Sequence, residues 1–204
     1  MKKTFLLILA VSFMAANIYA QDSRTELKIG LKAGFNFANV YDEEGDQFEA
    51  DGKFGFVGGG FLAVPIGKFL GIQPEILYSQ KGYQGTTSVA GINYGYSRTS
   101  SFIDIPILIT LKPSEQFTIL GGPQYSYLVQ QKDKFDNTTV EINFSNDNIR
   151  KNLLCFIIGF DFNMDNIVLG ARAGWDLQDN NGDGTSTIPR YKNVWYQATF
   201  GIRL

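Results

Sequence analysis

Apolar residues occupy every second position in eight separate stretches of this chain, and the last stretch runs to the final residue. In residues 194–204 the alternate apolar positions are Val194, Tyr196, Ala198, Phe200, Ile202 and Leu204. A period of two predicts a β-strand with one apolar face. Chain ends are usually frayed and polar. A patterned strand at the very end therefore predicts that the last strand pairs with another strand.

The eight stretches are joined by connections that alternate between short and long. The stretches cover residues 27–37, 54–64, 69–79, 102–112, 117–129, 153–162, 167–177 and 194–204. Short turns are expected at 66–68, 113–115 and 164–166, and long polar loops at 40–52, 82–98, 131–150 and 178–190. An even number of antiparallel strands with this alternation is typical of an outer-membrane barrel, and segments of about 10 residues can cross a bilayer when tilted. The expected fold is therefore all-β: an eight-stranded antiparallel up-and-down transmembrane β-barrel, closed by its first and last strands.

Aromatic residues on the apolar face gather at the strand ends. Near the long loops lie Phe35, Phe37, Phe54, Phe56, Tyr78, Tyr125, Tyr127, Phe156, Trp175 and Tyr196. Near the short turns lie Phe117, Phe160, Phe162 and Phe200. Two such belts are expected where a barrel meets the two membrane interfaces.

The opposite face of the same strands carries charges of both signs. These residues are Lys28, Lys32, Glu75, Asp104, Asp161 and Arg172. Balanced charges fit a network inside a lumen that side chains fill, as expected for eight strands, with some space left at Gly55 and Gly59. The alternative is a soluble periplasmic lipocalin-like barrel, in which the apolar face would point inward around a ligand.

The first 20 residues have the pattern of a secretory signal peptide. Lys2 and Lys3 precede an apolar run that is too short to span a bilayer, and Ala20 is a small residue at a plausible cleavage point. The expected division is a signal peptide at 1–20 and an outer-membrane barrel domain at 21–204. The formal net charge of -2 gives no indication of nucleic acid binding.

Several motifs resemble a known family. The segments GIQPEILYSQKGY, FIDIPILITLK and ILGGPQYSYLV, together with LKIGLKAGFNFANVY, LGARAGWDL and the closing FGIRL, are similar to the PorT-like outer-membrane barrel proteins of Bacteroidota. The resemblance spans essentially the whole mature chain. It implies that Pro74, Pro106 and Pro123 are tolerated within barrel strands, and we expect them at β-bulges. One member of the family supports protein secretion, which makes a secretion-related role an expectation here.

The composition argues against catalysis. The chain has no histidine, which is the usual base for activating a nucleophile. Glu75 and Asp104, on adjacent strands, could form a catalytic carboxylate pair. We favour their use as partners of Lys28, Lys32 and Arg172 in the lumen. No enzymatic activity and no cofactor are therefore expected.

Two further features are candidate reactive or metal-binding sites. The single cysteine, Cys155, has the parity of the lumen face and is expected to be a small filler of the core. In the loop DNNGDGTS, Asp179, Asn181 and Asp183 follow the opening of a calcium loop, but Arg190 stands where such a loop needs glutamate. An ordinary polar turn is favoured, and calcium remains the weaker alternative.

The sequence thus predicts an integral outer-membrane protein with a structural or partner-binding role. Expected partners are outer-membrane lipids, proteins that contact the loops, and the barrel-insertion machinery, although the terminal Leu204 departs from the aromatic residue that usually ends its signal. The alternatives are a narrow pore or a carrier of a small hydrophobic ligand.

Overall fold

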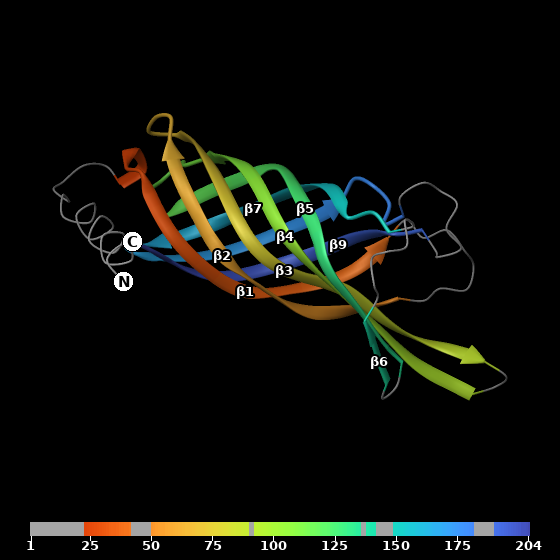
Figure 1. Ribbon diagram of the computed structural model, residues 1–204. Coiled ribbons are helices and arrows are strands. Elements are labelled where there is room, and N and C mark those ends of the chain that lie inside the picture. Colours follow the sequence, from red (N-terminus) through yellow and green to blue (C-terminus); the bar gives the residue numbers. More distant parts are fainter. Residues whose placement is uncertain (1–22, 42–49, 90–91, 136–137, 142–148, 182–189) are drawn as a thin grey trace, which may run out of the picture.

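Eight antiparallel strands close into a barrel (Figure 1). The computed structural model describes residues 23–41, 50–89, 92–135, 138–141, 149–181 and 190–204, without the side chains of 23, 86–89, 92–94, 135 and 138–141. The barrel strands are β1 (Lys28–Tyr41), β2 (Asp51–Pro65), β3 (Leu70–Val89), β4 (Ile92–Leu111), β5 (Phe117–Phe135), β7 (Asn152–Met164), β8 (Ile167–Asp176) and β9 (Lys192–Arg203). A short helix η1 (Ser23–Thr25) precedes them, and a short strand β6 (Thr138–Glu141) pairs with β5. No helix in these ranges is long and apolar enough to cross a membrane.

The barrel closes through its first and last strands, as the C-terminal alternation predicted. Strand β1 pairs with β9 from Gly30 opposite Arg203 to Tyr41 opposite Lys192. The order β4-β3-β2-β1-β9-β8-β7-β5 is completed by pairing between β4 and β5. Every barrel strand therefore has two neighbours, and no open sheet edge faces lipid within the wall.

The apolar residues of each strand point outward. Exposed fractions are 72% for Phe54, 64% for Ile76 and 54% for Ile107, whereas Glu75 is 2% exposed and Leu108 is fully buried. The predicted parity is confirmed. An apolar outer wall is the reverse of a lipocalin-like barrel, so the soluble alternative is wrong. The aromatic residues assigned to the two belts also lie on the outer wall, among them Phe35, Tyr127 and Phe160.

The short turns occur where they were predicted. Strands β7 and β8 are joined by two residues, and Asp165 in this turn has φ 46°, a left-handed conformation that aspartate tolerates better than most residues. The turn between β2 and β3 follows Pro65, and the turn between β4 and β5 follows Leu111. All three lie at the barrel end that also holds the C-terminus, shown at the left of Figure 1.

The predicted long loop at 82–98 is wrong, because most of it is strand. Strands β3 and β4 continue as a hairpin until Val89 pairs with Ile92. Strand β5 extends beside β4 to Phe135, opposite Tyr96, and β6 pairs with this extension. We call residues 82–89, 92–99, 130–135 and β6 the ribbon. Figure 1 shows it projecting beyond the barrel and leaning away from the barrel axis. Its Thr and Tyr residues favour strand.

The three strand prolines do not lie at bulges, contrary to expectation. The register is the same on both sides of each proline, and the pairing is only interrupted towards the preceding strand. No pairing is formed between Pro74 and Leu62, between Pro106 and Glu75, or between Pro123 and Ile107. Each proline lacks the N–H that such a pair could use, and the neighbouring pair is missing as well, so the ladder loses two consecutive pairs but keeps its register. The register shifts occur at Gly52/Val57 and Ser101/Phe102.

The space expected at Gly55 and Gly59 is occupied by backbone. A Cβ atom at Gly59 would lie 2.0 Å from the Ile76 carbonyl oxygen, and one at Gly55 would lie 2.3 Å from that of Gln80. Neighbouring strands thus approach these glycines too closely for any side chain. The glycines permit the tight curvature of a small barrel and do not leave a cavity.

Candidate functional site

Four charged side chains meet inside the barrel towards the short turns. Lys32 Nζ donates to Glu75 Oε1 at 2.6 Å, and the Arg172 guanidinium binds both oxygens of Glu75 at 2.8 and 3.0 Å. Arg172 Nη2 also lies 3.6 Å from Asp161 Oδ1. We call these four residues the lower quartet. Two cations and two anions give it no net charge, and all four side chains are buried.

Glycines on neighbouring strands make room for the lower quartet. Lys32 stands opposite Gly59 in β2 and Gly201 in β9. Arg172 stands opposite Gly159, and Asp161 opposite Gly170. A Cβ atom at Gly159 would lie 2.7 Å from Arg172 Cγ. The glycine-rich strands thus let long charged chains cross a narrow lumen, and the charges stabilise one another there because water is largely excluded.

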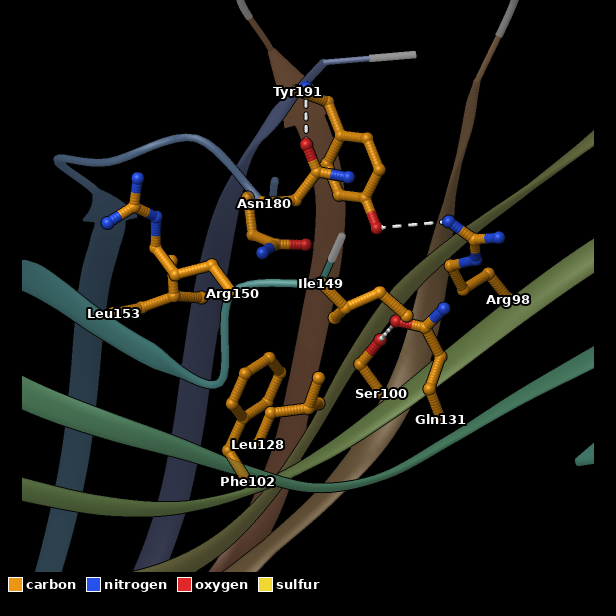
Figure 2. Close-up of a pocket in the computed structure, with 11 residues that line it drawn as sticks. Arg98, Ser100, Phe102, Leu128, Gln131, Ile149, Arg150, Leu153, Asn180 and Tyr191 are labelled. Atoms are coloured by element: carbon orange, nitrogen blue, oxygen red, sulfur yellow. Dashed lines mark hydrogen bonds between the residues drawn. The ribbon is translucent and has the colours of Figure 1, made fainter. Parts of the chain in front are cut away.

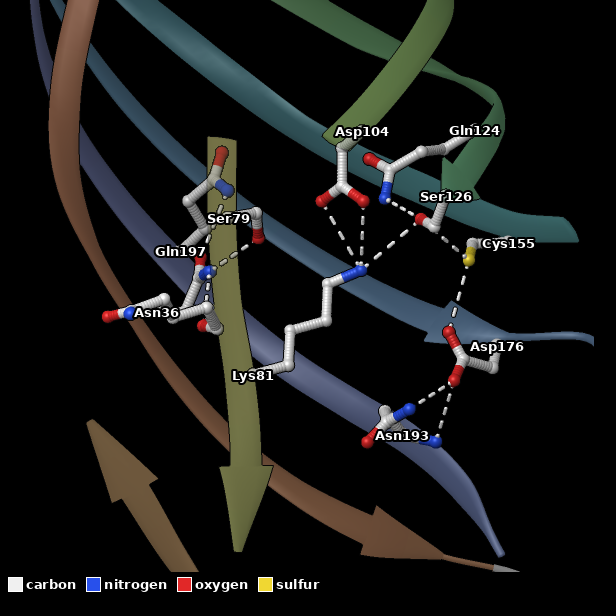
Figure 3. A network of polar contacts seen from close by, with 11 residues as sticks. Asn36, Ser79, Lys81, Asp104, Gln124, Ser126, Cys155, Asp176, Asn193 and Gln197 are labelled. Atoms are coloured by element: carbon white, nitrogen blue, oxygen red, sulfur yellow. Dashed lines mark hydrogen bonds and ion pairs between the residues drawn. The ribbon is translucent and has the colours of Figure 1, made fainter. Parts of the chain in front are cut away.

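A second charged group lies nearer the long connections (Figure 3). Lys81 Nζ lies 3.3 Å from Asp104 Oδ2 and 3.4 Å from Ser126 Oγ. Cys155 Sγ donates to Asp176 Oδ1 at 3.1 Å. These groups join strands β3, β4, β5, β7 and β8 across the lumen. Cys155 is fully buried, which places it in the core as predicted.

An apolar layer also fills the lumen. It contains Ala38, Phe102, Leu108, Leu120, Leu128, Leu153, Cys155, Ile157 and Trp195. The Lys81 ammonium lies 3.7 Å from the centroid of the Trp195 ring, close enough for a cation–π interaction. Trp195 fits because Gly174, opposite it, has no side chain. Side chains therefore fill the interior of the barrel and do not surround an open channel.

The mouth of the barrel at the ribbon end is held by an ion pair and a tyrosine cluster. Arg98 donates from Nε and Nη2 to the two carboxylate oxygens of Asp133, at 2.8 and 2.7 Å, and from Nη1 to the Tyr191 hydroxyl at 3.3 Å. Tyr83 packs against Tyr191 and Tyr96. Burial raises the pKa of Tyr83, which lies in the ribbon outside the membrane-spanning part of β3. The hollow beside Arg98, shown in Figure 2, has a volume of about 20 Å³. That is enough for a water molecule and too small for an organic ligand.

The opposite mouth is equally restricted. A hollow of about 20 Å³ is lined there by Lys28, Gln73, Lys112 and Arg203, among others. Lys28 lies 3.5 Å from Glu26 and takes no part in the lower quartet.

The structure brings together three of the five predicted lumen residues. Lys32, Glu75 and Arg172 are in direct contact, whereas Lys28 pairs with Glu26 and Asp104 pairs with Lys81. The suggested carboxylate pair is not formed, because Glu75 and Asp104 each bind a different lysine. Any function of these residues as a site stays a prediction.

Sequence reasoning missed the charged residues nearer the ribbon, Lys81, Arg98 and Asp133. Lys81 precedes the stretch assigned to a loop, and Arg98 and Asp133 lay within such stretches. The signal that could have found them is the period of two in SRTSS (97–101) and QKDK (131–134). It continues the strand pattern beyond the last apolar residues.

The calcium alternative at Asp179, Asn181 and Asp183 remains untested, because the loop lies only partly within the described residues. Arg150 Nε donates to the backbone carbonyls of Asp179 and Asn181, at 3.0 and 3.2 Å. A calcium ion would have to compete with this guanidinium. Asp183 lies outside the described residues, within which no cluster of three metal-ligating side chains occurs.

A closed barrel with an apolar wall, aromatic belts and a charged interior defines an integral outer-membrane β-barrel protein. The chain belongs to the family of outer membrane protein beta-barrel domains, whose model matches residues 19–180.

Solved structures agree on the fold. Neisserial surface protein A is 12% identical, with a TM-score of 0.54, and the match covers 86% of this chain and 97% of that one. The attachment invasion locus protein Ail of Yersinia pestis, in complex with the heparin analogue sucrose octasulfate, is 15% identical, with a TM-score of 0.51, covering 88% and 99%. No curated protein matches the chain.

Proposed function

We propose that this protein is a non-enzymatic, non-conducting outer-membrane barrel that holds the ribbon beyond the membrane for a protein partner. Residues 1–20 serve as its signal peptide, and the barrel-insertion machinery places it in the outer membrane. By its resemblance to PorT-like proteins of Bacteroidota, a component of a secretion system is the kind of partner we expect.

The filled lumen is the observation that carries this proposal. The lower quartet, the apolar layer and the Arg98–Asp133 pair follow one another along the axis, and each joins side chains from different strands. Opening a path for ions would require separating buried charges that pair with one another, which is costly. This argument weighs against the narrow pore.

The carrier and enzyme alternatives have less support. The apolar hollow of about 440 Å³ lined by Ile29, Leu31, Leu62 and Ile76 lies on the outer wall, where lipid chains would fill it. It is not a ligand chamber inside the barrel. Glu75, the most buried carboxylate of the lower quartet, is fully engaged by two cations and is not placed to act as a base.

The ribbon is the part best placed to meet a partner. Three long strands support it, and its base is stiffened by the Arg98–Asp133 pair and the tyrosine cluster. A rigid projection reduces the entropy lost when a partner binds.

Site-specific photo-crosslinking in living cells would test this function. A photoreactive residue at Gln84, on the exposed surface of the ribbon, should give a discrete protein adduct. The same residue at Ile107, on the lipid-facing wall, should not. Equal adducts at both positions, or none at several ribbon positions, would contradict the proposal.

A further inference from the structure

Three lysines lie together on one face at the base of the ribbon. The backbone register places Lys132 opposite Thr99 and Lys134 opposite Ser97, and paired residues of neighbouring strands share a face. Lys53 reaches across from β2, where its Nζ donates to Ser97 Oγ at 2.6 Å and to Thr99 Oγ1. We call Lys53, Lys132, Lys134, Ser97 and Thr99 the basic patch.

The lysines of the basic patch form no ion pair with any side chain that the structure describes. Within the side chains that the structure describes, no carboxylate contacts the ammonium group of Lys53, Lys132 or Lys134. Asp133 points to the other face and is occupied by Arg98. Asp51 is exposed and lines the same hollow as Lys134. The backbone register also places Glu141 of β6 opposite Lys132. Three lysines thus stand against two carboxylates, and the surface keeps a net positive charge.

The patch lies just beyond the aromatic belt. On β4 the outward positions continue from Ile105 and Ile103 through Ser101 to Thr99 and Ser97. The hydroxyl of Tyr78, a residue of the belt, donates to Ser101 Oγ at 2.9 Å. The face of the patch is thus the continuation of the lipid-facing wall. Figure 1 shows the ribbon leaning away from the barrel axis. Since the face of the patch continues the lipid-facing wall, we infer that it faces the membrane surface.

We propose that the basic patch binds the phosphate of an anionic lipid headgroup in the adjacent leaflet. Ammonium groups donate charge-assisted hydrogen bonds to phosphate oxygens. The Ser97 and Thr99 hydroxyls accept from Lys53 and keep their own protons for a phosphate oxygen. A hollow of about 390 Å³ beside Lys134, lined also by Asp51, Gln84 and Ser97, accommodates the remainder of the headgroup. The inference rests on the membrane barrel and does not depend on the ribbon having a protein partner.

Lipid titration monitored by native mass spectrometry would test the site. The purified full-length protein in zwitterionic detergent would be titrated with diphosphoryl lipid A, with phosphatidylcholine and with inorganic phosphate. Each basic residue near a membrane surface contributes about fivefold to binding anionic lipid. Lys132→Gln with Lys134→Gln should therefore weaken lipid A binding about 30-fold. Asp51→Asn should strengthen it.

Two controls separate a site from general charge. Lys151→Gln with Lys192→Gln removes the same charge from the same end of the barrel, away from the patch. This control should bind lipid A within about twofold of the wild type, in contrast to the roughly 30-fold loss expected for the patch variant. Lys132→Arg with Lys134→Arg keeps the charge and should retain binding. The heat-dependent shift in gel mobility checks that each variant is folded. Equal losses in both glutamine pairs, unchanged binding in the patch variant, or equally tight binding of inorganic phosphate would overturn the proposal.

Discussion

Removal of the Glu75 charge should destabilise the barrel strongly. Glu75 receives hydrogen bonds from Lys32 and Arg172 and is 2% exposed. Glu75→Gln keeps the size of the side chain but leaves the lower quartet with two cations and one anion. Removing one partner of a buried ion pair typically costs about 3–5 kcal/mol. The folding equilibrium constant at a given urea concentration should therefore fall by roughly two to four orders of magnitude.

A second substitution should restore part of this loss. Lys32→Met combined with Glu75→Gln leaves Arg172 with Asp161, 3.6 Å away, and returns the group to neutrality. We therefore expect the double variant to be more stable than Glu75→Gln alone, although two polar contacts are lost. Substitutions of neighbouring residues in one network are not additive. The double variant should therefore lose less stability than the sum of the losses of the two single variants.

Reversible urea unfolding in lipid vesicles, followed by the heat-dependent shift in gel mobility, measures both variants. Glu26→Gln provides the control, because its partner Lys28 is partly exposed and the pair should contribute at most about 1 kcal/mol. Purely additive costs, or a Glu75→Gln variant as stable as Glu26→Gln, would refute the buried charge-balanced quartet.

Three other predictions concern the wall, the curvature and the orientation. Ile107→Arg, on the lipid face, should cost about 2–4 kcal/mol in vesicle folding, and more than Thr110→Arg, which points inward; equal costs would mean that the faces are misassigned. Gly59→Ala should impair folding because its Cβ would lie 2.0 Å from a carbonyl oxygen, whereas Gly60→Ala meets nothing closer than 3.6 Å and should fold normally; folding yields that do not differ would contradict the close strand approach. If the ribbon is extracellular, an impermeant maleimide should label Gln84→Cys in intact cells but Gly67→Cys only after permeabilisation. The native Cys155 is buried and should stay unlabelled in both variants. The reverse labelling pattern would mean that the barrel has the opposite orientation.

The barrel itself could be predicted because, in a strand that crosses a membrane, the alternate apolar residues must face lipid and the residues between them must face the lumen. Once Ile103, Ile105 and Ile107 face lipid, Asp104 must face inward, and the lipid-facing positions of the other strands follow from the same rule. The alternation of short and long connections then gives the order of the strands.

The ribbon and the ion-pair partners could not be predicted in the same way. Apolar alternation stops where a strand leaves the membrane, so the polar strand segments at 82–98 resembled a loop. The partner of a lumen charge depends on stagger between strands, which sequence pattern does not fix. Lys81 therefore appeared unrelated to Asp104, and Lys28 was assigned to a network that it does not reach.

Single-channel recording in planar bilayers tests the closed lumen most directly. The purified protein should insert without stable ohmic conductance, because the lower quartet and the apolar layer fill the path between the two mouths. Replacing Glu75 and Arg172 together by glycine should by itself introduce no conductance, because the apolar layer still fills the lumen. Reproducible conductance steps in the wild-type protein, removed by a bulkier substitution at Gly201 beside the quartet in a protein that still folds, would contradict the account and favour a pore.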